Sequence, residues 1–109
     1  MSGATRAHRL TLPKSFLSQL DAFMRFPDQR SGDVFYRRDI PASPHLSLQW
    51  VVRHDIFEGT VAQLSLIDDE AGRYLAGEDR PLKEAGDVWG SYTVRTGEAE
   101  YRLEVAPEP

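Results

Sequence analysis

The chain has 109 residues, of which 40% are hydrophobic and 28% are charged, which suits one domain with one core and argues against a disordered chain. It contains no cysteine, so disulfide bonds, cysteine nucleophiles and cysteine-ligated metals are excluded. The net charge is −4, and no apolar run approaches the roughly 18 residues of a membrane-spanning helix.

The basic residues are concentrated in the first third of the chain. The first 38 residues hold seven Lys or Arg and three Asp, whereas the remainder holds six Lys or Arg and 14 Asp or Glu. This asymmetry is typical either of a solvated surface or of a basic arm that meets an acidic partner. Residues 1–9 predict a flexible basic segment, followed by a single α+β domain over residues 10–109. They lack the apolar stretch of a secretory signal, so a cytoplasmic location is expected.

The stretch "TLPKSFLSQLDAFMRFP" predicts the first element, a helix. Its apolar residues recur at steps of three and four and share one face: Phe16, Leu17, Leu20, Phe23 and Met24. Pro13 suits a first helical turn, and Pro27 cannot continue a helix, so the helix should end near Phe26. We expect its apolar face to lie on a sheet.

Beyond residue 33 the hydrophobic period changes to two, and Gly, Pro and Asp punctuate the chain. This pattern predicts strands at 33–40, 46–54, 60–67, 73–77, 87–95 and 98–105. The connections are too short for parallel crossovers, so the sheet is expected to be antiparallel. The predicted fold is α+β, with an N-terminal helix packed on a five- to six-stranded antiparallel β-meander. The predicted core consists of Leu20, Phe23, Leu48, Trp50, Leu64, Leu66, Tyr92 and Leu103.

The last two predicted strands allow a register to be proposed. A two-residue turn at Thr96-Gly97 makes one face of the hairpin apolar and the other polar except for Trp89. Thr-Gly is a weaker turn signal than Asn-Gly, so a bulged turn of three or four residues is the alternative. The two-residue turn predicts the pairs Arg95–Glu98, Val94–Ala99, Tyr92–Tyr101, Gly90–Leu103 and Val88–Val105.

Three consecutive carboxylates, Asp68, Asp69 and Glu70, are the most chemistry-like feature of the sequence. The residues "DEAG" match a type I turn in which Asp69 accepts backbone hydrogen bonds and Gly72 adopts a positive φ. A calcium loop needs further oxygen ligands at alternating positions, and the residues that follow supply none. The stretch is therefore interpreted as a turn.

No other pattern indicates catalysis or a cofactor. The sequence has no HExxH, GxSxG, SxxK, GxxxxGK[ST] or GxGxxG motif, so no catalytic residue, metal or cofactor is predicted. A zinc site built from His45, His54 and a carboxylate is the weaker reading, and loop histidines in water are the stronger one.

One face of the predicted sheet combines aromatic residues with arginines. Such a face can stack bases, but Asp33, Asp39, Glu100 and Glu104 share it, which disfavours nucleic acid. A protein contact or a dimer seam fits it better. The alternative for Trp89 is that the helix, the tail or the 78–86 loop covers it within one monomer. The candidate interaction face consists of Phe35, Arg37, Val51, Arg53, Trp89 and Arg102.

These patterns favour a small, stand-alone, non-catalytic protein-interaction module, such as an adaptor, inhibitor or immunity-type protein of a bacterium, phage or plasmid. Its partner would be another protein or a second copy of the chain, with no membrane involved. Two alternatives stay open. One is a small-ligand binder or enzyme with a pocket between helix and sheet, and the other is a nucleic-acid binder. The inward polar residues available to such a pocket are Tyr36, Arg38, Tyr92 and Tyr101.

Overall fold

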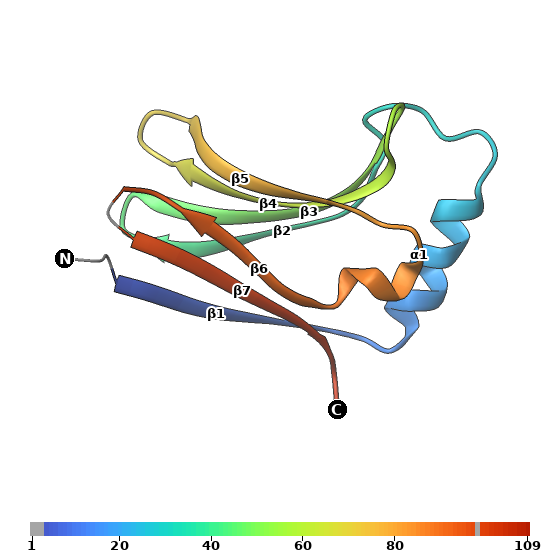
Figure 1. Ribbon diagram of the computed structural model, residues 1–109, viewed down its shortest axis with the longest axis horizontal. Coiled ribbons are helices and arrows are strands. Elements are labelled where there is room, and N and C mark those ends of the chain that lie inside the picture. Colours follow the sequence, from blue (N-terminus) through green and yellow to red (C-terminus); the bar gives the residue numbers. More distant parts are fainter. Residues whose placement is uncertain (1–3, 98) are drawn as a thin grey trace.

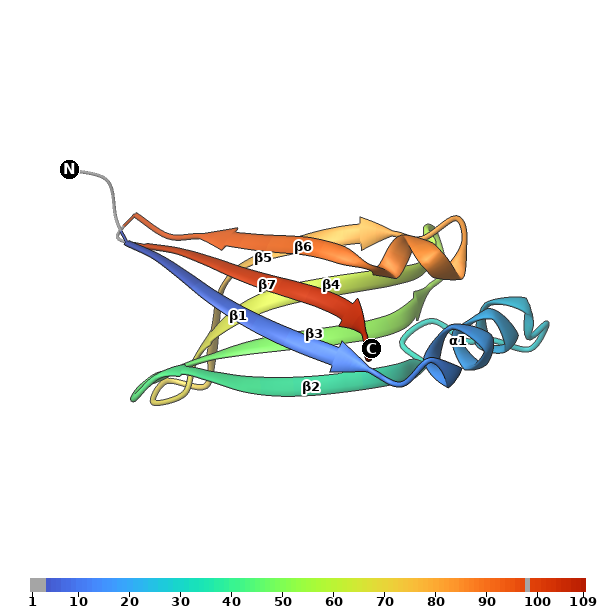
Figure 2. The same cartoon turned by 90° about the horizontal axis from the view of Figure 1, so that it is seen from below.

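A computed structural model describes residues 4–97 and 99–109 (Figure 1). Within them the chain is α+β, with one α-helix and seven strands in two sheets that pack face to face (Figures 1 and 2). The elements in chain order are β1 (Ala4–Leu12), α1 (Ser15–Arg25), β2 (Val34–Ser43), β3 (Leu46–Asp55), β4 (Gly59–Asp68), β5 (Arg73–Pro81), the 3-10 helix η1 (Ala85–Val88), β6 (Gly90–Arg95) and β7 (Ala99–Pro107).

The larger sheet is an antiparallel meander in the order β2-β3-β4-β5. Its strands correspond to the predicted segments 33–40, 46–54, 60–67 and 73–77, and β5 continues to Pro81. Alternation sets the faces: Leu48, Trp50 and Val52 of β3 point into the core, and the intervening residues point outward. The α+β class and the antiparallel meander are thus confirmed for this part of the chain.

The smaller sheet has the order β1-β7-β6 and contains a strand that the sequence analysis does not predict. Residues 4–12 pair in parallel with β7, from Ala4 opposite Ala99 to Leu12 opposite Pro107. The structure therefore differs from the expected loose segment over residues 4–9 and from an entirely antiparallel sheet. The parallel pair is possible because the rest of the chain, not a short loop, connects the two strands.

Helix α1 forms where the spacing of apolar residues predicts it. Phe16 and Leu20 are buried, and the helix ends before Phe26, whose backbone is extended. Its position differs from the expected one. It covers the end of the sandwich beside η1, where β1 ends and β2 begins, and does not lie across a sheet (Figure 1).

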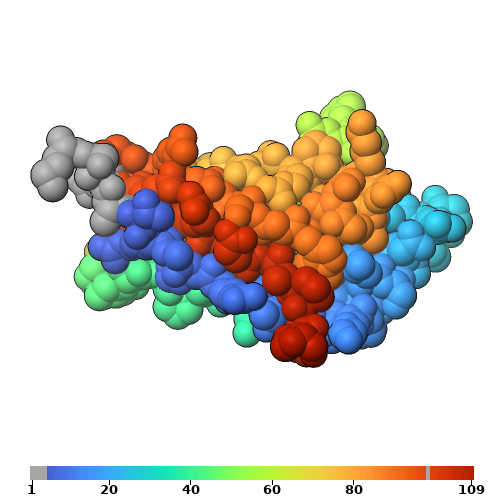
Figure 3. Space-filling view, turned by 60° about the horizontal axis from the view of Figure 1, so that its bottom comes forward, coloured from blue at the N-terminus to red at the C-terminus, as the bar shows by residue number. Residues whose placement is uncertain are grey.

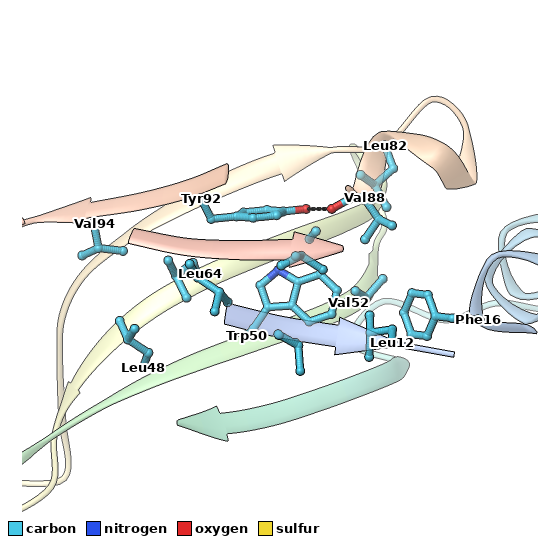
Figure 4. Packing of buried hydrophobic residues seen from close by; sticks show 14 of the residues in the cluster. Leu12, Phe16, Leu48, Trp50, Val52, Leu64, Leu82, Val88, Tyr92 and Val94 are labelled. Carbon is cyan, nitrogen blue, oxygen red and sulfur yellow. Dashed lines mark hydrogen bonds between the residues drawn. The ribbon is translucent and has the colours of Figure 1, made fainter. Parts of the chain in front are cut away.

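The predicted core is confirmed (Figure 4). Phe23 alone among the eight predicted residues is only partly buried, at the edge of the cluster. Trp50 lies at the centre, and its ring centroid is 5.8 Å from that of Tyr92 and 6.3 Å from that of Phe16. The Tyr92 hydroxyl donates a 2.7 Å hydrogen bond to the Val88 carbonyl, so this buried polar group is satisfied.

The β6–β7 hairpin has the wider turn. Val94 lies opposite Tyr101 and Tyr92 opposite Leu103, two residues away from the pairs that the two-residue turn predicts. The predicted pair Arg95–Glu98 involves residue 98, which lies outside the described residues. A shift of two residues leaves every side chain on the same face, so the predicted apolar and polar faces are correct although the pairs are wrong.

Strands β5 and β6 run side by side along one long side of the sandwich (Figure 2). Side chains of β5 bridge the two strands there. The backbone N–H of Thr93 donates to Glu78 Oε1 at 2.9 Å, and Arg80 donates to the Ser91 carbonyl. The Arg80 guanidinium carbon also lies 3.8 Å from the centroid of the Tyr92 ring. These contacts occupy two backbone groups of the free edge of β6 without adding another strand.

Candidate functional site

The structure does not bring the six predicted interface residues onto one surface. Arg37, Val51 and Arg53 lie on the outer face of the larger sheet, with Arg37 opposite Val51. Arg102 lies in β7 between the buried residues Tyr101 and Leu103, so it points to the outer face of the other sheet. The two outer faces are on opposite sides of the sandwich.

The remaining two residues, Phe35 and Trp89, pack against α1. Phe35 is an extra residue at a β-bulge between Val34 and Tyr36, and its ring centroid is 5.3 Å from that of Phe16. Trp89 follows η1 and is not part of a strand, and its centroid is 6.1 Å from that of Phe16. The helix therefore covers Trp89 within one monomer, which is the alternative that the sequence left open.

The outer arginines are engaged in ion pairs along their own strands. Arg37 lies 3.2 Å from Asp39, and Arg53 lies 3.5 Å from Asp55. This mixture of signs is typical of a solvated sheet face.

The histidines and carboxylates are spread over the fold. His45 precedes β3 and His54 lies near its end, so the strand separates them. Within residues 4–97 and 99–109, no group of three or more His, Cys, Asp or Glu side chains could hold a metal ion.

The acidic stretch forms a turn. Asp68 Oδ1 accepts hydrogen bonds from the N–H groups of Glu70 at 3.0 Å and Ala71 at 3.2 Å, and Gly72 has φ +62°. The first position of the turn is therefore Asp68, one residue before the predicted Asp69. Asp69 instead accepts a 2.7 Å hydrogen bond from the Ser47 hydroxyl.

A Gly72→Ala substitution is expected to lower the free energy of unfolding by about 1–2 kcal/mol, because alanine must adopt a left-handed conformation. Gly86→Ala is the matched control, since both glycines face open space and only Gly72 has a positive φ. Urea denaturation measures both values. Equal losses in the two variants would show that the positive φ of Gly72 is not the cause of the lost stability. Glu70→Gln should leave stability unchanged, with or without calcium.

The most exposed apolar residues occupy the turn between β3 and β4. Phe57 is 93% exposed and Ile56 is 68% exposed. We call these two residues the apolar tip. Asp55 Oδ1 accepts hydrogen bonds from the N–H groups of Phe57 at 2.8 Å and Glu58 at 3.0 Å, and Gly59 has φ +79°. The backbone that carries the apolar tip is therefore held in one conformation.

The loop between α1 and β2 lies alongside this hairpin. The N–H of Gly32 donates to the His54 carbonyl at 2.9 Å, and the N–H of His54 donates to the Asp33 carbonyl at 2.8 Å. Val34, at the start of β2, lies opposite Arg53 and is 56% exposed. In Figure 3 the hairpin, in lime green, projects beyond its orange neighbours.

The apolar tip carries negative charge beside it. The hydrogen bond from the Phe57 N–H, followed by that from the Glu58 N–H, lowers the pKa of Asp55 below its usual value, and Arg53 adds to the effect. Glu58 is exposed. The apolar side chains of Ile56 and Phe57 thus lie in the sequence between the carboxylates of Asp55 and Glu58.

The sequence itself contains a signal for the apolar tip. In "DIFEG", two large apolar residues stand inside a turn that Asp55 and Gly59 define. Both side chains are exposed in the monomer, so the turn places two large apolar groups at the surface.

Two hollows lie at opposite ends of the sandwich. One, of about 320 Å³, lies between the start of α1, the end of β1 and the start of β2, and Tyr36 and Arg38 line it. The other, of about 600 Å³, lies near the β6–β7 turn, and Tyr101 lines it. Of the four predicted inward polar residues, two meet in the first hollow. Tyr92 lies instead in the core.

Scans of this chain against family models, curated proteins and solved structures found no match. No helix among the described residues is long and apolar enough to cross a membrane.

Proposed function

We propose that this chain is a non-catalytic protein-interaction module that inserts the apolar tip into an apolar pocket of a partner protein. The observation that carries the proposal is the 93% exposure of Phe57 on a turn that side-chain hydrogen bonds hold in place. Large aromatic side chains at the centre of a contact supply much of the energy of protein interfaces.

The rigidity of the turn supports an anchoring role. Burying a phenylalanine side chain stabilises a complex by about 1.5–3 kcal/mol. A flexible loop would lose part of this energy on ordering, whereas the Asp55 hydrogen bonds order the turn before binding. Val34, opposite Arg53 in the neighbouring strand, is a further exposed apolar side chain at this end of the larger sheet.

The charges around the apolar tip favour a protein pocket over a lipid surface. Asp55 and Glu58 flank Ile56 and Phe57, and Asp33 lies in the adjoining loop. Anionic lipid headgroups would repel these carboxylates, whereas a protein pocket with Lys or Arg at its rim would attract them.

Site-specific photo-crosslinking tests the proposal. A benzoylphenylalanine at position 57 should crosslink one partner in cells that express the chain. The same group at position 74, also exposed but at the other end of the larger sheet, should not. Equal crosslinking from both positions would contradict the proposal.

With the identified partner purified, Phe57→Ala is expected to raise Kd about 10- to 100-fold, or about 1.4–2.8 kcal/mol. Titration calorimetry measures Kd, with Tyr74→Ala as the control that leaves Kd unchanged. The thermal melt of Phe57→Ala should match that of the parent chain, because the side chain makes little contact in the monomer. An unchanged Kd would exclude the apolar tip as the anchor.

A further inference from the structure

The two sheets leave four free edges, which belong to β1, β2, β5 and β6. Unpaired edges attract further strands, and proteins block them with bulges, proline or side chains. The edges of β2, β5 and β6 are blocked in these ways, whereas the edge of β1 is not.

The edge of β2 is interrupted by bulges at Phe35 and Ala42 and by Pro41, which has no N–H. The edge of β5 is bulged at Leu75 and ends in a proline. The edge of β6 receives the Glu78 and Arg80 side chains described above.

The edge of β1 is regular over nine residues. The strand "ATRAHRLTL" pairs with β7 without a register shift and contains no proline or glycine. The Leu12 carbonyl accepts from the N–H of Glu108, so the even-numbered residues direct their backbone groups toward β7. By alternation, Thr5, Ala7 and Arg9 direct their N–H and C=O groups to the free edge. All three are exposed.

The β1 edge is also basic. Arg6, His8 and Arg9 lie in this strand, and it contains no carboxylate. Within the described part of the chain, neither Arg6 nor Arg9 forms an ion pair. The strand therefore offers a row of backbone donors and acceptors beside these two arginines, although Glu104 of β7 lies opposite Arg9 in the ladder.

We infer that the β1 edge binds an extended acidic peptide segment of a partner protein, which adds as a fourth strand beside β1. Main-chain hydrogen bonds would supply the affinity. Carboxylates on both faces of the added strand, one beside the inward-facing Arg6 and one beside the outward-facing Arg9, would select the sequence. A second copy of β1 fits poorly, because it would place like charges side by side. This surface is separate from the apolar tip, so the inference does not depend on the proposed function.

The test uses two labelled nine-residue probes, three copies of Val-Glu-Glu and three copies of Val-Lys-Lys, which carry charge on both faces of an added strand, with binding followed by fluorescence anisotropy. The acidic probe is expected to bind at least about ten-fold more tightly than the basic one. Ala7→Pro should weaken its binding at least about ten-fold, because proline removes an edge N–H that β7 does not use. Ala7→Thr keeps that N–H and should bind as the parent chain does.

A double variant that reverses the charge, Arg6→Glu with Arg9→Glu, tests the inference even if the proline variant does not fold. This double variant should prefer the basic probe. Amide exchange should show that the acidic probe protects the N–H groups of Ala7 and Arg9. Equal binding of both probes, or a reversal variant that keeps its preference, would overturn the inference. So would light scattering that shows a dimer which Ala7→Pro dissociates, since a second copy would then occupy the edge.

Discussion

A Trp50→Ala variant is expected to lose about 3–5 kcal/mol of unfolding free energy, which is much of the total stability of a domain of this size. Trp50 has 0% exposure and touches both layers of the core. Its ring lies 5.7 Å from Tyr36, 5.8 Å from Tyr92 and 6.3 Å from Phe16, measured between centroids. Alanine would leave a cavity where the two sheets and α1 meet.

Urea denaturation followed by circular dichroism measures this loss, and Trp50→Phe is the control. Among the described residues, the buried indole N–H makes no hydrogen bond of regular geometry. It lies near enough to the Tyr92 hydroxyl to lower the pKa of Tyr92 slightly against the rise that burial causes, so phenylalanine removes only a weak polar contact. We expect Trp50→Phe to cost about 1–2 kcal/mol. A Trp50→Ala loss below about 1 kcal/mol would contradict the central position of this side chain.

Raising the pH from 10 toward 12 is expected to destabilise the fold by about 2–3 kcal/mol through Tyr92 alone. Burial raises the pKa of Tyr92 from 10.0 to about 12, and the nearby Arg80 opposes this only in part. In that pH window the unfolded chain releases the phenol proton while the folded chain keeps it. The stabilisation is therefore complete below pH 10 and is lost as the pH rises through the folded-state pKa.

Denaturation curves at several pH values test this expectation against Tyr92→Phe. The variant should be less stable at neutral pH, because the Val88 carbonyl loses its donor. Its stability should fall less between pH 10 and 12 than that of the parent chain. Parallel declines in both proteins would show that other groups cause the alkaline loss.

Local periodicity predicts most elements of this fold, and it fails where geometry depends on distant segments. The helix and the strands of the meander follow from steps of three and four and from alternation. In β1 only Leu10 and Leu12 continue the apolar alternation, and the inward positions before them are Arg6 and His8. A strand whose inner face is half polar lacks the period-two signal.

Local hydrophobic patterns also do not predict that the strands divide into two sheets. One long meander and a two-layer sandwich bury the same alternating faces. The chain changes sheets at η1, where Leu82, Ala85 and Val88 are buried, although the sequence there reads as a loop. The hairpin register shows the same ambiguity, since a shift of two residues changes the pairs and preserves the faces.

The predicted interface depended on that single sheet. Placing Arg102 and Arg37 together required one continuous face, and the sandwich separates them. Phe35 was assigned by alternation, which the bulge at this position interrupts. The apolar tip has no period-two signal, because its residues lie inside a turn and not in a strand.

The parallel pairing of the first and last strands affects how the chain can fold during its synthesis. Ala4 pairs with Ala99, so β1 leaves the ribosome almost a whole chain length before its partner exists. At about 5–20 residues per second, β1 waits about 5–20 s, whereas each hairpin of the larger sheet can close as soon as its second strand appears. Such long-range contacts slow folding because they close the largest loop. The polar, basic composition of β1 favours hydration of the waiting segment, and we expect the smaller sheet to form after the larger one.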